Sequence, residues 1–62
     1  MEHGKIVARK RCAFGSAAFK QGEQGRYQME DARHALISHG DGKPRVLVHA
    51  ECLREYFEVI PA

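Results

Sequence analysis

The sequence predicts a single small α+β domain over residues 1–62, in which a small β-sheet with a β-hairpin is followed by one C-terminal helix. Three observations predict this fold class. Apolar residues alternate in two N-terminal segments, an Asp-Gly dipeptide separates two apolar runs, and the last apolar residues recur at helical spacing. With 44% hydrophobic residues, the chain can build one small core. Residues 1–4 and 61–62 are expected to be flexible ends.

The N-terminal half is expected to supply two strands. The first, residues 5–14, places four apolar side chains on one side: Ile6, Ala8, Cys12 and Phe14. A segment rich in glycine follows and predicts a turn and a loop, with Ser16 capping a short helical turn over residues 17–20. Residues 26–30 form the second strand, with Tyr27 and Met29 facing the core.

The clearest local signal is the hairpin over residues 34–49. Asp41-Gly42 between apolar runs predicts a type I′ turn. That turn sets the pairing of the two strands: His34 opposite His49, Ala35 opposite Val48, Leu36 opposite Leu47, and Ile37 opposite Val46. Apolar side chains occur on both faces, so we expect both faces to be covered.

Residues 50–60 are predicted to form the helix. Leu53, Phe57 and Ile60 stand at positions i, i+4 and i+7, which gives one apolar stripe. Pro61 follows the expected end, as is common after a helix.

A candidate metal site lies at the junction of hairpin and helix. His49 and Cys52 are three residues apart, and imidazole and thiolate are ligands that zinc prefers. The hairpin register brings His34 across from His49, and Cys12 precedes a sequence that can form a tight turn. The predicted ligand set is therefore Cys12, His34, His49 and Cys52. A metal-free protein in which both cysteines are simply packed remains the alternative.

The stretches "CAFGSAAFKQGEQGRY" and "VHAECL" resemble a treble-clef zinc finger over roughly residues 10–57. In that family, a knuckle C-x2-C-G is followed by a hairpin and by a helix whose first turn supplies two ligands. Cys12 matches the first knuckle cysteine, and His49 and Cys52 match the helix pair. Gly15 stands where the second knuckle cysteine belongs. The resemblance therefore implies a degenerate finger, with His34 as the fourth zinc ligand or with the metal lost.

Charge is distributed unevenly along the chain. Residues 1–26 carry a net charge of +4 and residues 27–62 a net charge of −2. The basic N-terminal strand predicts phosphate contacts by five residues, Lys5, Arg9, Lys10, Arg11 and Lys20, with Arg26 nearby. Small treble-clef proteins often bind nucleic acid, so the resemblance implies the same partner. The alternative for these charges is an exposed strand edge protected against aggregation.

The expected function is that of a small non-enzymatic binding module for nucleic acid. The alternative is a protein-interaction or inhibitor module, an accessory protein of bacterial or phage type, and the basic and acidic halves would suit a homodimer. A chain of 62 residues leaves little room for a substrate cleft, so no enzyme is expected. No apolar run approaches the roughly 20 residues of a membrane span, and no secretory signal is found, so we expect a cytoplasmic protein without membrane partners.

Overall fold

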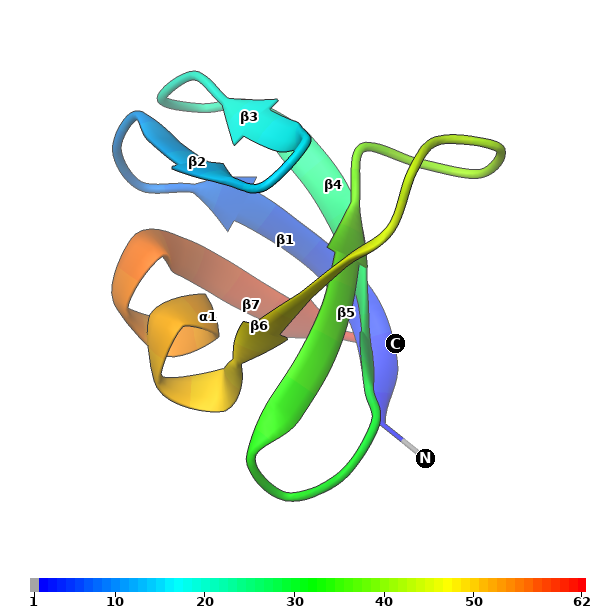
Figure 1. The fold of residues 1–62 in the computed structure, drawn as a ribbon. Coiled ribbons are helices and arrows are strands. Elements are labelled where there is room, and N and C mark those ends of the chain that lie inside the picture. The colour runs from blue at the N-terminus through cyan, green and yellow to red at the C-terminus, as the bar shows by residue number, and fades with distance from the viewer. Residues whose placement is uncertain (1) are drawn as a thin grey trace.

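The computed structural model describes residues 2–62, which form seven strands and one helix (Figure 1). The elements in chain order are β1 (His3–Ala8), β2 (Cys12–Phe14), β3 (Ala17–Phe19), β4 (Gln24–Met29), β5 (His34–Ser38), β6 (Val46–His49), α1 (Ala50–Tyr56) and β7 (Phe57–Pro61). Five strands form an antiparallel sheet in the order β6-β5-β4-β1-β7, and β2 and β3 pair with each other. An antiparallel sheet with one helix confirms the α+β prediction at this coarse level.

The prediction of a helix to residue 60 is wrong, because α1 ends at Tyr56 and the chain continues as β7. β7 pairs with β1 from Ala8 opposite Phe57 to Gly4 opposite Pro61. Without this pairing, the outer edge of β1 would leave its backbone groups without a sheet partner. Helical and extended periodicity both place Phe57 in the core, but only the strand turns Ile60 outward.

The single strand predicted over residues 5–14 is divided into β1 and β2. The chain turns at residues 9–11, where the N–H of Arg9 donates to the carbonyl of Tyr56 at 2.8 Å. The helical turn predicted after Ser16 is also wrong, because residues 17–19 form β3. Gly15 has φ of 58° at the first central position of the two-residue β2–β3 turn, the position where a type II′ hairpin turn needs glycine.

The predicted β5–β6 register is confirmed over the four strand pairs from His34 opposite His49 to Ile37 opposite Val46. The turn type is wrong: Gly42 has φ of 79°, but no described residue other than glycine has a positive φ, so Asp41 cannot take the type I′ conformation. Positive φ at the second central residue fits a type II turn, closed by the N–H of Lys43 donating to the carbonyl of Gly40 at 3.1 Å.

Only one face of the β5–β6 hairpin is covered, so the prediction of two covered faces is wrong. Ala35, Ile37 and Val48 are buried, whereas Leu47 on the other face is 57% exposed. The β2–β3 hairpin and α1 both pack on the first face and contribute Ala17, Phe19 and Leu53 to the core (Figure 1). In this small chain no further element of residues 2–62 remains to cover the second face, which we call the outer face.

Both ends of the described chain lie in paired strands. Gly4 pairs with Pro61, and the N–H of Ala62 donates to the carbonyl of His3 at 2.9 Å. The segments expected to be flexible ends therefore contribute to the sheet, apart from Met1, which lies outside the described residues. Within residues 2–62, no helix has the length and apolar character needed to cross a bilayer, since α1 has only seven residues.

The phenol of Tyr27 predicts how stability changes at alkaline pH. Tyr27 is buried, and its hydroxyl donates to Glu2 Oε2 at 2.6 Å. Burial, and then the hydrogen bond to the Glu2 carboxylate and its negative charge, raise the pKa of Tyr27 to about 12. The unfolded chain loses this proton near pH 10. The protonated Tyr27 therefore contributes its full stabilisation to the folded state below pH 10, and this contribution is lost as the pH rises towards 12.

We expect the free energy of unfolding to fall by about 2–3 kcal/mol across this interval. Urea denaturation at a series of alkaline pH values measures the fall, and Tyr27→Phe should remove it. Glu2→Gln should remove only part of it, because burial of the phenol persists. An equally steep fall in Tyr27→Phe would assign the alkaline loss to other groups.

Candidate binding surfaces

The outer face is formed by the side chains of the sheet that point away from the core. Directly opposed residues of antiparallel strands point to the same side, so the register defines its rows. One row runs across four strands through Leu47, Leu36, Gln28 and His3. The next row places Ser38, Arg26, Lys5 and Ile60 side by side. The outer face therefore carries basic side chains at its centre and apolar side chains on β6 and β7.

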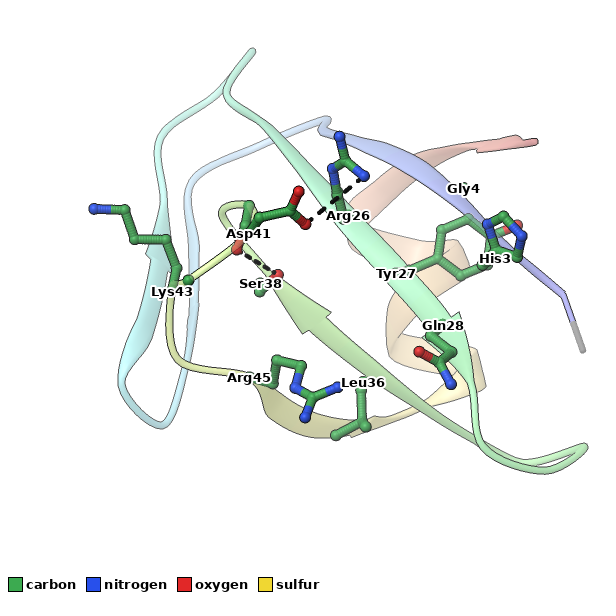
Figure 2. A pocket seen from close by; sticks show the side chains of 12 residues that line it. His3, Gly4, Arg26, Tyr27, Gln28, Leu36, Ser38, Asp41, Lys43 and Arg45 are labelled. Atoms are coloured by element: carbon green, nitrogen blue, oxygen red, sulfur yellow. Dashed lines mark hydrogen bonds and ion pairs between the residues drawn. The ribbon is translucent and has the colours of Figure 1, made fainter.

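A hollow of about 590 Å³ lies on this face between the sheet and the loop 39–45 (Figure 2). Its charged lining consists of three cations and one carboxylate: Arg26, Lys43, Arg45 and Asp41. Arg26 and Asp41 form an exposed ion pair of 3.8 Å, which contributes little to stability. Lys43 and Arg45 form no ion pair within residues 2–62. The hollow is thus an open, positively charged depression that we call the basic hollow.

The five basic residues predicted to contact nucleic acid do not share one surface. Lys5 lies on the outer face beside Arg26. The other four, Arg9, Lys10, Arg11 and Lys20, lie where the chain enters and leaves the β2–β3 hairpin. Of these, Lys10 is engaged by Glu55 at 3.9 Å and stands 4.6 Å from the centre of the Tyr56 ring. Arg11 and Lys20 line a smaller groove of about 420 Å³ along the hairpin.

Sequence reasoning missed Lys43 and Arg45 as candidate residues and named Arg26 only as a neighbour of the predicted basic site. Side chains alternate along β4, so the pattern that places Tyr27 in the core also turns Arg26 outward. The sequence therefore indicated that Arg26 is exposed. Lys43 and Arg45 follow the Asp41-Gly42 turn closely, and the hairpin register would have placed them beside β5.

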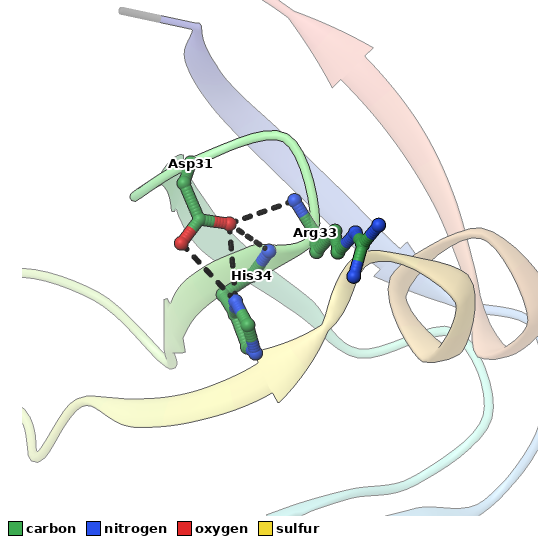
Figure 3. Close-up of polar contacts among 3 residues, drawn as sticks. All are labelled: Asp31, Arg33 and His34. Atoms are coloured by element: carbon green, nitrogen blue, oxygen red, sulfur yellow. Dashed lines mark hydrogen bonds and ion pairs between the residues drawn. The ribbon is translucent and has the colours of Figure 1, made fainter.

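His34 and His49 form the second group on the outer face. They are opposite each other on β5 and β6, and their ring centroids are 5.0 Å apart. Asp31 holds the start of β5: its Oδ1 accepts the N–H of Arg33 at 2.7 Å and that of His34 at 2.9 Å (Figure 3). The same oxygen lies 3.0 Å from Nδ1 of His34. The pKa of Asp31 is lowered, first by the Arg33 N–H and then by His34.

Of the two cysteines, Cys12 is located apart from this histidine pair. Cys12 lies on β2 and packs partly against the core, where burial raises the pKa of its thiol and nearby Lys10 opposes that rise. Figure 1 shows the β2–β3 hairpin at the opposite end of the molecule from the start of β5. Cys52 is half-buried on α1, and neither cysteine forms a disulfide.

These positions show whether the four predicted ligands can bind one zinc ion together. Across the described part of the chain, no three histidine, cysteine or acidic side chains are gathered closely enough to hold one ion. Cys12 would also have to lose its proton in a partly buried setting before it could bind zinc. The set of Cys12, His34, His49 and Cys52 and the treble-clef resemblance therefore stay predictions, of which the structure assembles only the two histidines.

Comparisons with protein-family models, with curated proteins and with solved structures found no match to this chain.

Proposed function

We propose that this chain is a non-enzymatic binding module that contacts the phosphate backbone of nucleic acid through its outer face. The observation that carries the proposal is the basic hollow, where three cations meet one carboxylate on an open surface. Lys5 on β1 extends the same positive surface beside Arg26. Neutralised phosphates release bound counterions, which favours association with any sequence.

The aromatic residues favour contacts with phosphates over contacts with bases. Single-stranded nucleic acids are commonly bound by stacking bases on exposed aromatic rings. In this chain every aromatic ring is buried or half-buried on the core side: Phe14, Phe19, Tyr27, Tyr56 and Phe57. The outer face offers cations and amides instead, which suit phosphate oxygens. We therefore expect binding with little sequence preference.

The proposal is tested with two double variants that remove equal charge from different places. Arg26→Gln with Arg45→Gln neutralises the basic hollow, and Arg11→Gln with Lys20→Gln neutralises the hairpin groove. Fluorescence anisotropy with a labelled DNA duplex measures affinity at several salt concentrations. We expect the first variant to lower the slope of log K against log salt by about 2, one for each phosphate that the protein no longer neutralises.

The hairpin variant is the matched control and should keep both the affinity and the salt slope. Equal losses in the two variants would show a nonspecific charge effect and contradict the outer-face site. Absence of salt-dependent binding to DNA and RNA by the wild type would contradict the function itself.

A protein partner is the second candidate function, favoured by apolar side chains on the two edge strands. Leu47 on β6 is 57% exposed and Ile60 on β7 is 44% exposed, and Leu36 stands next to Leu47. Exposed apolar groups on unpaired strand edges are common at protein contacts. This candidate, including a homodimer, gains support if the wild type ignores nucleic acid but self-associates in sedimentation at increasing concentration.

A further inference from the structure

The backbone brings the side chains of His34 and His49 as close as a sheet allows. The N–H of Ala50 donates to the carbonyl of Arg33 at 2.7 Å, so the bond joins the residues that flank the pair. His34 and His49 are therefore a non-hydrogen-bonded pair, the kind in which opposed side chains are nearest. The pair is fixed by the strand register and by the start of α1 immediately after His49.

The separation of the rings matches that of two ligands on one metal ion. Two imidazoles bound to a tetrahedral zinc ion, at the usual zinc–nitrogen distance of about 2.1 Å, hold their ring centroids roughly 5 Å apart. The centroids of His34 and His49 are 5.0 Å apart, with an angle of 39° between the ring planes. His49 is exposed and the side chain of His34 is 35% exposed, so an ion can reach both rings from solvent.

Asp31 fixes the hydrogen on one of the two rings. An ionised carboxylate only accepts hydrogen bonds, so the contact of 3.0 Å between Asp31 Oδ1 and His34 Nδ1 places the hydrogen on Nδ1. In the neutral ring, Nε2 then carries a free lone pair. A carboxylate behind a histidine is the usual support for a metal-binding imidazole, because it fixes the tautomer and raises the basicity of the ligand nitrogen.

We propose that His34 and His49 form a binding site for a divalent transition-metal ion such as Zn²⁺, supported by Asp31 and independent of the two cysteines. The two imidazoles supply two ligands, and water completes the coordination. Imidazole favours zinc, copper and nickel over magnesium, and copper binds most tightly in the usual order of affinities. This site is separate from the basic hollow and rests on different residues.

Isothermal titration of Zn²⁺ into the full chain, with its cysteines kept reduced, tests the proposal. We expect one ion per chain, tighter binding of Cu²⁺, and no heat of binding with Mg²⁺. His49→Gln should abolish Zn²⁺ binding, and Asp31→Asn should weaken it by about 10- to 100-fold, as for other partners of metal-binding histidines. In NMR spectra, Zn²⁺ should shift the imidazole nitrogens of His34 and His49 first.

Two controls decide which side chains are responsible. His3→Gln removes another exposed histidine, on β1, and should leave Zn²⁺ binding unchanged. Cys12→Ser with Cys52→Ser should also leave it unchanged, whereas the four-ligand set predicted from the sequence would lose the ion. Zinc binding that needs the cysteines or survives His49→Gln would overturn the proposal, and so would absence of binding. Thermal melts of the metal-free variants check that each one is folded.

Discussion

Replacement of Phe57 by alanine is expected to remove about 3–5 kcal/mol from the free energy of unfolding. The Phe57 ring is fully buried where α1 passes into β7, with its centroid 5.1 Å from that of Phe19 and 6.1 Å from that of Phe14. It therefore joins the β2–β3 hairpin to the main sheet. A chain of this length has roughly 3–9 kcal/mol of stability in total, so the substitution removes a large share of it.

Urea denaturation followed by circular dichroism measures this loss. Ile60→Ala is the matched control, because Ile60 lies on the same strand but is 44% exposed and stands outside the core. The control should change the free energy of unfolding by less than about 1 kcal/mol. If Ile60→Ala lost as much stability as Phe57→Ala, Ile60 would also be packed in the core, and the helix predicted to residue 60 would regain support.

The hairpin was predictable because its signals are local. Asp41-Gly42 and the apolar runs beside it were enough to pair His34 with His49, and the structure has that pairing. The candidate metal site proposed here depends directly on this register. The sequence pattern could not show which face of the hairpin is buried, because burial depends on whether another helix or strand packs on that face. Leu47 is therefore exposed, although the apolar run around it is typical of a buried strand.

The elements that sequence reasoning missed depend on contacts between distant parts of the chain. β1 ends where Arg9 bonds to Tyr56, 47 positions further along, and β7 forms only because β1 offers it an edge. The end of β1 at residue 8 separates Lys5 from Arg9, Lys10 and Arg11. One predicted basic strand thus became two basic surfaces, and Arg26 and Arg45 joined Lys5 only through strand pairing.

Gly25→Ala is the second change with a large expected effect, because β4 passes closely over the core at this residue. A β-carbon at Gly25 would lie 2.5 Å from the carbonyl oxygen of Ser38 and 2.9 Å from a ring carbon of Phe19. The Phe19 ring is fully enclosed and Ser38 belongs to the paired strand β5, so neither can move aside freely. Overpacking of this kind costs about 1–3 kcal/mol or more, and we expect the upper end.

Gly40→Ala is the control, since a β-carbon there meets no atom within 4 Å and the residue needs no positive φ. Chemical denaturation should separate the two variants by more than about 2 kcal/mol. Gly25 precedes Arg26, and both Arg26 and Ser38 line the basic hollow. Any backbone shift of β4 or β5 that accommodates the new methyl group therefore also moves the lining of the hollow. The Gly25→Ala variant should therefore lose affinity for DNA together with stability, even at temperatures where it remains folded. Unchanged stability and affinity would mean that β4 and β5 do not approach each other this closely.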